Sequence, residues 1–340
     1  MLIALAYYFL CRKAKKAPKP RAVAPEHSAP AHYLEKRKTA LKLLDEHAPA
    51  ETEWEPAEPW DSDRPSFYFV PREVVLAHEA GGELARMQTL RDANKLVNKT
   101  IDLHDAFRGG NTAHQILFVS HRWEDTTRPD LKGEQLRCVQ DYLKEHEGVQ
   151  WVWYDYSCMP QKDHTPLDAN GKAKETRSKS ELYEFKHMLA SINDLYLTCR
   201  VLILLDKSYS SRFWTLMEGW CAMQTATADG VRPARDDEQR CSIACIHNAT
   251  EKFDQAGLVD MISTKTPEEM HFLLGQPDIA VTSMKDKAIM LPIVETTDEH
   301  VRTVMAAAKV KAKADAAKAA AAAALKAVEE AAAEEAAFEK

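Results

Sequence analysis

The sequence lacks the short motifs that mark the most common ligand-binding α/β proteins. Only 11 of its 340 residues are glycine, and it contains neither a Walker A loop nor the glycine fingerprint of dinucleotide-binding folds. It also has no zinc-binding spacing of cysteine and histidine and no Gly-x-Ser-x-Gly nucleophile elbow. These absences disfavour phosphate-loop ATPases, nicotinamide-dependent dehydrogenases of the Rossmann type and serine hydrolases.

Cysteine is also scarce, and positive charge is outnumbered by negative charge, with 45 Lys and Arg against 52 Asp and Glu. The seven cysteines are scattered through apolar segments rather than paired at short spacing, so we expect reduced, buried thiols rather than a secreted disulfide framework. Cys241 and Cys245 stand at alternate strand positions, which ordinary packing explains, and we expect no metal. The net charge of −7 gives no reason to expect a nucleic-acid partner.

The longest purely apolar stretch is the leader at residues 1–11, MLIALAYYFLC. It is too short to cross a bilayer, which takes roughly 20 residues, and its positive charges follow the apolar run, the reverse of a secretory signal. The pattern is compatible with a start-site artefact, a truncated anchor or a weak interfacial anchor over residues 1–21. We expect a cytoplasmic protein, with membrane attachment through this leader left open.

Composition divides the chain into four parts. Residues 1–66 form the apolar leader and a Pro- and charge-rich linker, with helical periodicity at 32–46. Residues 67–111 are expected to be a helical extension packed on the core, and residues 112–295 the main domain. Residues 296–340 are rich in Ala, Lys and Glu and predict an exposed helical tail. This tail has no sustained heptad of large apolar residues, so a stable coiled coil is not expected.

Within the main domain, short apolar strands alternate with longer helical segments. Strands are predicted at 115–120, 150–156, 200–206 and 241–247, and helices at 133–145, 181–199, 211–226, 250–261 and 267–274. Nearly continuous apolar strands joined by helices indicate a parallel sheet covered on both faces. The predicted fold class is therefore α/β, a flavodoxin-like open sheet.

Polar residues follow each of the four predicted strands. In open α/β sheets ligands bind beyond the carboxyl ends of the strands, although loop anchoring and capping also place polar residues there. The candidate substrate-binding residues at this edge are Ser120, Arg122, Trp123, Asp125 and Tyr156.

The predicted helix at 211–226 is apolar around most of its circumference and carries one carboxylate, Glu218. Ser211 and Trp214 fall on the same helical face as Glu218 and join the candidate site. Burial makes a carboxylate costly and raises its pKa unless it is paired. Two ordinary alternatives stay open: an ion pair with Arg122 or Arg212, or a side chain that reaches solvent.

Two segments resemble the Toll/interleukin-receptor (TIR) domain family, as a divergent branch. The run ILFVSHRWEDTTR is similar to the plant TIR opening, with Ser120, Arg122, Glu124, Asp125 and Thr126 matching in order. Residues 208–218, SYSSRFWTLME, resemble the family segment in which a tryptophan precedes a glutamate by four residues. The sequence departs from the family at Trp123, Thr215 and Gly219, where Gly, Cys and Leu are usual.

The resemblance implies two functions. In catalytically active TIR domains the glutamate matching Glu218 is required for NAD+ cleavage, so the chain is expected to be an NAD+ glycohydrolase if active, with NAD+ as substrate and no cofactor. The alternative is a non-enzymatic adaptor that associates with itself or other TIR-like domains through the 157–180 loop. A third interpretation, a nucleoside-processing transferase, would need Asp155 or Asp206 as a second carboxylate.

Overall fold

The computed structural model describes residues 35–36, 39, 61–79, 81–163 and 174–338. The apolar leader, most of the linker and most of the predicted helix at 32–46 lie outside these residues. Among the helices that are described, none combines the length and apolar character that crossing a bilayer requires.

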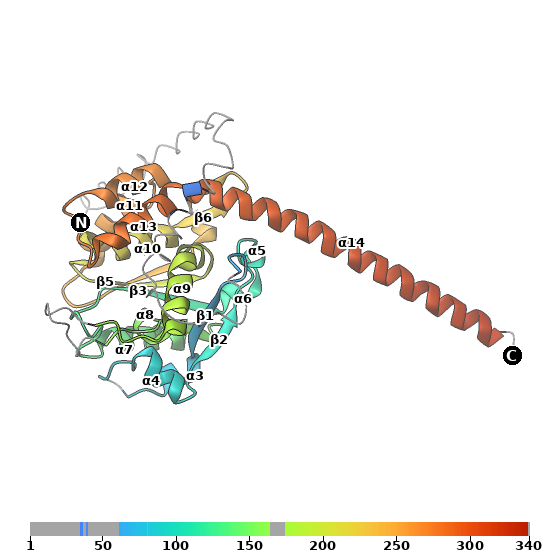
Figure 1. Ribbon diagram of the computed structural model, residues 1–340, viewed down its shortest axis with the longest axis horizontal. Coiled ribbons are helices and arrows are strands. Elements are labelled where there is room, and N and C mark those ends of the chain that lie inside the picture. Colours follow the sequence, from blue (N-terminus) through green and yellow to red (C-terminus); the bar gives the residue numbers. More distant parts are fainter. Residues whose placement is uncertain (1–34, 37–38, 40–60, 80, 164–173, 339–340) are drawn as a thin grey trace, which may run out of the picture.

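A six-stranded sheet in the order β2-β1-β4-β3-β5-β8 forms the centre of the molecule (Figure 1). Its four parallel strands are β3 (Ile116–His121), β4 (Trp151–Trp153), β5 (Arg200–Leu205) and β8 (Cys241–Cys245). Numbered along the chain, these four stand in the order 2-1-3-4, as in the flavodoxin-like arrangement. The predicted fold class is confirmed.

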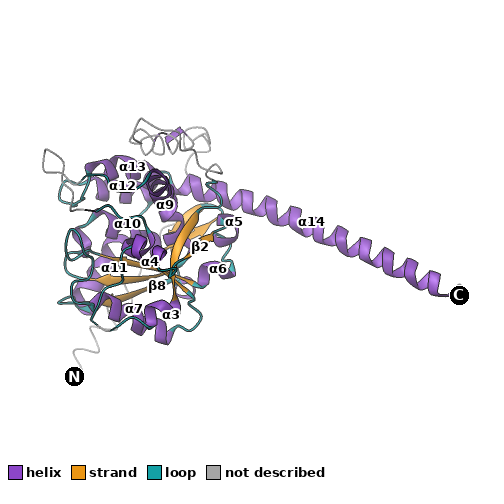
Figure 2. Ribbon diagram, turned by 60° about the horizontal axis from the view of Figure 1, so that its bottom comes forward, coloured by secondary structure: helices purple, strands orange, loops and turns teal. Residues whose placement is uncertain are grey.

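Helices cover both faces of this sheet (Figure 2). One face carries α3 (Arg72–Leu76) and α7 (Glu134–Glu145); the other carries α9 (Lys179–Thr198) and α10 (Phe213–Ala222). Outside α10 lie α11 (Ala256–Ile262), preceded by a single π-turn, η3 (Glu251–Gln255), then α12 (Pro267–Gly275) and α13 (Met284–Glu295). This two-sided cover explains why β3 and β5 are almost wholly apolar and buried.

The expectation of a helical extension at 67–111 was wrong in one respect, because this segment adds two strands to the sheet. β1 (Ser66–Pro71) pairs antiparallel with both β4 and β2 (Val97–Thr100). Phe67 and Phe69 are fully buried, and each ring packs against Phe118 of β3 with centroids 6.5 and 6.3 Å apart. Only short helices remain in the segment: α3, α4 (Met87–Asp92), α5 (Leu103–Ala106) and α6 (Asn111–His114).

The predicted helical tail is α14 (Thr297–Phe338), which runs away from the body (Figure 1). Its first turns pack against α13, α5 and the hairpin of β6 (Gln224–Thr227) and β7 (Gly230–Pro233) through Val301, Val304 and Ala308, all buried. Every residue from position 313 to position 327 is exposed. A single-turn helix, η2 (Asp236–Glu238), leads from the hairpin to β8.

Candidate functional site

The two motifs that carry the family resemblance meet through a hydrogen bond between Ser120 and Glu218. Ser120, the second-last residue of β3, is fully buried, and its hydroxyl donates to Glu218 Oε2 at 2.6 Å. Glu218 lies on α10, which packs on β3 because most of its side chains are apolar. The chain therefore places a carboxyl group at the carboxyl edge of the sheet, beside the point where the strand order reverses.

A buried tyrosine supports Ser120 from the turn before α10. This turn, η1 (Tyr209–Ser211), is tied to the helix by the Thr215 hydroxyl, which donates to the Tyr209 carbonyl at 2.5 Å. The Tyr209 hydroxyl then lies 2.6 Å from Ser120 Oγ. A Cβ atom at Gly219 would lie 3.2 Å from this tyrosine oxygen. Thr215 and Gly219, two positions that differ from the TIR pattern, thus both shape the contact between Tyr209 and Ser120.

The environment of Glu218 favours its neutral form. Burial raises its pKa to about 8; the hydroxyls of Ser120 and Tyr196 act in the opposite direction, whereas the negative charge of Asp155 raises it further. Glu218 is only partly buried. Its neighbours therefore desolvate the carboxyl group, but the residue still has some contact with solvent.

Neither arginine considered as a partner neutralises Glu218. Arg122 Nε donates to Asp206 Oδ2 at 2.6 Å, and Arg212 is exposed at the start of α10. Within the described part of the chain, no ion pair joins either of them to Glu218. A buried carboxyl group with a strongly raised pKa is a candidate functional group.

Asp155 joins the loops that follow β3 and β4. The predicted strand at 150–156 ends early, because the chain turns at Tyr154 into α8 (Asp155–Cys158). Asp155 Oδ1 then lies 2.9 Å from His121 Nε2, and its Oδ2 accepts a hydrogen bond from Trp123 Nε1 at 2.7 Å. The Trp123 ring meets Tyr156 edge to face, with centroids 5.4 Å apart. Two aromatic side chains are therefore held at the same edge as Glu218.

The end of β8 is linked to this edge as well. His247, which has a left-handed backbone with φ of 54°, lies between two carboxylates. Its Nε2 is 2.9 Å from Glu124 Oε1, and its Nδ1 is 3.0 Å from Glu134 Oε2. Polar contacts thus connect the loops after β3 and β8 with the start of α7.

Three of the predicted site residues lie apart from Glu218 and Ser120. Asp125 is exposed and accepts hydrogen bonds from the amide and hydroxyl of Thr127, which lower its pKa. Ser211 is exposed and donates to the Ser208 carbonyl. Trp214 Nε1 donates to Asp286 Oδ2 at 3.1 Å, which turns its indole toward α13.

No site role was predicted from the sequence for Tyr209 or Tyr196. Tyr209 stands inside the motif at 208–218, so its position could have drawn attention. Tyr196 comes from α9 and donates its hydroxyl to the Val119 carbonyl at 3.2 Å, while also stabilising the charged form of Glu218. A tyrosine within an apolar helix is ordinary core sequence, and no local signal distinguishes this one.

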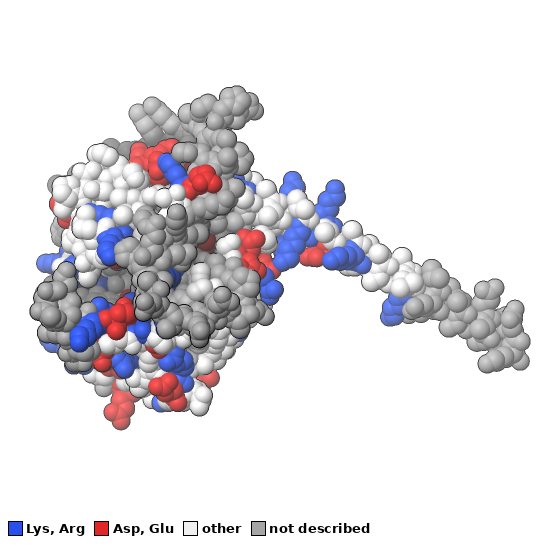
Figure 3. Space-filling model, viewed as in Figure 1, with Lys and Arg blue, Asp and Glu red and all other residues white. Residues whose placement is uncertain are grey.

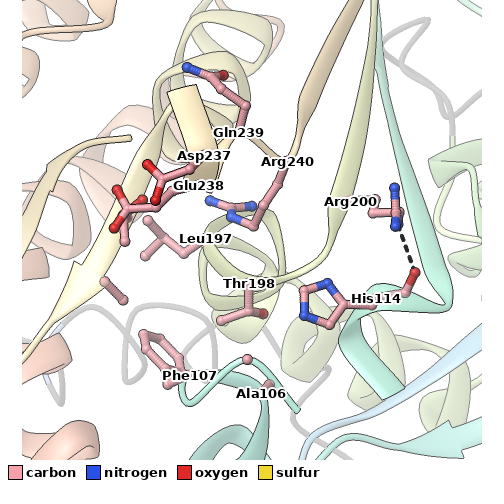
Figure 4. Close-up of a pocket in the computed structure, with 13 residues that line it drawn as sticks. Ala106, Phe107, His114, Leu197, Thr198, Arg200, Asp237, Glu238, Gln239 and Arg240 are labelled. Carbon is pink, nitrogen blue, oxygen red and sulfur yellow. Dashed lines mark hydrogen bonds between the residues drawn. The ribbon is translucent and has the colours of Figure 1, made fainter. Parts of the chain in front are cut away.

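An open cavity of about 380 Å³ lies at the opposite edge of the sheet, near the amino ends of β5 and β8 (Figure 4). Its cationic side chains are occupied in structural bonds. Arg240 donates to the carbonyls of Cys199 and Gln224 at 2.7 and 2.6 Å, and Arg200 donates to the His114 carbonyl at 2.9 Å. This cavity shares no residue with the cluster around Glu218.

Comparison of the chain with protein-family models, curated proteins and solved structures finds no match. The functional argument therefore rests on the residues and geometry of this chain.

Proposed function

We propose that this chain is a TIR-like signalling domain that cleaves NAD+ to nicotinamide and ADP-ribose, with Glu218 as the key carboxylate. The observation that carries the proposal is the state of Glu218. It is desolvated, has no arginine partner among the residues that the structure describes, and accepts a hydrogen bond from a buried serine at the carboxyl edge of the sheet.

The main requirement of the reaction is that the protein stabilises the positive charge that develops on the ribose. The bond between the ribose anomeric carbon and the nicotinamide nitrogen breaks, and nicotinamide leaves with the bonding electrons as a neutral molecule. Water then attacks the resulting oxocarbenium centre and loses one proton to the solvent. A carboxylate beside the ribose hydroxyls orients them and stabilises this charge. Because the leaving group needs no proton, one glutamate is sufficient.

The neighbours of Glu218 have distinct roles in this proposal. Ser120 holds the carboxyl group through its hydroxyl, and Tyr196 lowers the pKa of Glu218. Trp123, fixed by Asp155, offers an aromatic surface for the nicotinamide ring, and Tyr156 packs against its edge. Arg122, fixed by Asp206, contributes positive charge at the same edge for the substrate phosphates.

The test is an NAD+ consumption assay on the purified protein, both dispersed and clustered on a surface. We expect turnover by the wild type and its loss, by at least about a hundredfold, in Glu218→Ala and Glu218→Gln, since electrostatic stabilisation by one group is typically worth that much. Asp286→Asn is the matched control: Asp286 is also a partly buried carboxylate with a raised pKa, but it bonds Trp214 away from the cluster. Equal turnover by wild type and Glu218→Ala would overturn the assignment. No turnover by wild type in either state would favour the adaptor function.

A further inference from the structure

Asp155 is surrounded by three N–H groups at the carboxyl edge of the sheet. Its Oδ2 accepts a hydrogen bond from Trp123 Nε1 at 2.7 Å, and its Oδ1 accepts one from the Tyr156 amide at 2.6 Å. Oδ1 also lies 2.9 Å from His121 Nε2. A protonated carboxyl group would donate from one of its oxygens, whereas a charged carboxylate only accepts. The contacts of Asp155 therefore correspond to the charged form.

The histidine beside Asp155 does not cancel this charge. The His121 side chain is 2% exposed, and among the described residues its Nδ1 atom is buried without a hydrogen-bond partner. A proton on Nδ1 would be a buried donor with no acceptor, which is unfavourable. The favoured form is the neutral ring, with its one proton on Nε2 and directed at Asp155.

No arginine or lysine compensates Asp155 either. In the part of the chain that the structure describes, His121 is the one basic residue in ion-pair contact with it, and Arg122 bonds Asp206 instead. The Asp155 side chain is 34% exposed, so its charge is accessible at this edge. The charge also acts on Glu218, whose pKa is raised first by burial and further by Asp155.

A local charge of this kind is important because the surrounding surface does not sort ligands by charge. On the face of the body that Figure 3 shows, positive and negative side chains are interspersed rather than gathered by sign. Such a surface provides no broad field of one sign to steer a charged ligand. Discrimination by charge would therefore depend on individual groups at the site.

We propose that Asp155 is a specificity-determining residue that selects substrates with a cationic leaving base, and therefore binds NAD+ in preference to NADH. This inference rests on the proposed function. The nicotinamide ring of NAD+ carries a formal positive charge, whereas the dihydronicotinamide ring of NADH is neutral. A cationic ring at Trp123 is attracted both by the indole face and by the carboxylate that bonds the indole nitrogen. A neutral ring lacks both attractions.

The charge of Asp155 acts on substrate binding more than on bond cleavage. As the glycosidic bond breaks, the ring takes the bonding electrons and becomes neutral nicotinamide, so its attraction to Asp155 falls. NAD+ is therefore held more tightly than the departing ring, and the neutral product is released. We expect Asp155→Asn to raise the KM for NAD+ about five- to tenfold, the effect of one partly screened charge pair, without lowering kcat.

The experiment titrates NAD+ and NADH separately into the full chain that carries Glu218→Gln, which should bind NAD+ without cleaving it. We expect this protein to bind NAD+ about five- to tenfold more tightly than NADH. D155N/E218Q should bind the two with similar affinity, because only the binding of NAD+ weakens. D286N/E218Q is the matched control: Asp286 also accepts a hydrogen bond from an indole, that of Trp214 at 3.1 Å, but away from Glu218.

A second measurement needs no nucleotide. Because the charge of Asp155 raises the pKa of Glu218, Asp155→Asn should lower that pKa, whereas Asp286→Asn should leave it unchanged. A carboxyl carbon NMR titration of Glu218 in the full chain follows this shift, and circular dichroism checks that each variant is folded.

The outcomes separate the inference from the proposed function. Equal affinity of the Glu218→Gln protein for NAD+ and NADH would overturn the inference, even if Asp155→Asn failed to fold. An equal loss of both ligands in D155N/E218Q would also overturn it, since Asp155 would then only position Trp123. In either case Glu218-dependent turnover by the wild type would leave the proposed function standing. A wild type that neither binds nor cleaves NAD+ would overturn both.

Discussion

Glu218 is the residue whose chemistry depends most on its protonation. With a pKa of about 8, it is mostly neutral at pH 7 and charged above pH 9. The proposed reaction requires the charged form. We therefore expect turnover at saturating NAD+ to rise with pH between 7 and 9, which a pH–rate profile would measure. A rate that is flat over this range would show that the ionisation of Glu218 does not govern the reaction.

The same group makes folding stability depend on pH. The folded-state pKa of Glu218, about 8, lies above its ordinary value of 4.5, so the folded protein binds this proton more tightly than the unfolded chain does. Its contribution is fully present below pH 4.5 and is lost as the pH rises through 8. Glu218→Gln imitates the neutral form, and we expect it to unfold at a higher temperature than wild type at pH 9. The difference should shrink toward pH 5; a constant difference would contradict the raised pKa.

Substitutions at Gly219 test whether the contact between Tyr209 and Ser120 requires the absence of a side chain at position 219. Leucine, usual in the family, would drive its Cβ to within 3.2 Å of both Tyr209 and Ile262 and place further atoms beyond. We expect Gly219→Leu to lower the free energy of unfolding by about 1–3 kcal/mol through overpacking. Denaturant titration measures this. Gly219→Ala is the control. Its gain in helix propensity of about 1 kcal/mol offsets the milder crowding by one methyl group, so its free energy of unfolding should stay close to that of wild type. A Gly219→Leu variant as stable as wild type would contradict the close approach of Tyr209 to position 219.

At the scale of single elements, the sequence correctly predicted the strands and helices that are determined by the pattern of neighbouring residues. β3, β5 and β8 are mostly apolar runs, and α7 and α9 lie within two residues of their predicted bounds. The helix predicted at 211–226 is shorter: α10 covers Phe213–Ala222, and Gln224–Thr227 form β6 instead. The capping box of Ser178 and Glu181 shows why α9 starts at Lys179. These features depend on neighbouring residues and are therefore visible in the sequence.

Elements whose formation depends on distant partners were harder to predict. β1 is only six residues long and becomes a strand by pairing with β4, about 80 residues later. The predicted face shared by Ser211, Trp214 and Glu218 fails for a different reason. Ser211 belongs to the single 3-10 turn η1, and α10 begins only at Phe213, so Ser211 and Glu218 do not share one regular helix. The roles of the candidate site residues stay predictions until activity is measured.

At the scale of the whole molecule, β1 and β2 are an integral part of the sheet, because β1 covers the edge of β4. A chain that begins at residue 112 would lose both strands and leave β4 as an exposed edge, with Phe118 stripped of two aromatic neighbours. We expect this chain to aggregate or lose its near-ultraviolet circular dichroism, whereas a chain that begins at residue 61 should keep both solubility and signal. A soluble, cooperatively folded 112–340 chain would show that the two strands are dispensable.

The strand order has a consequence for how the protein assembles during synthesis. β1 and β2 precede all four parallel strands along the chain, so they are synthesised first. β4 must then insert between β1, made long before it, and β3. Because closing such long loops is slow, we expect the pairing of β4 with both β1 and β3 to be a late step in the formation of the sheet.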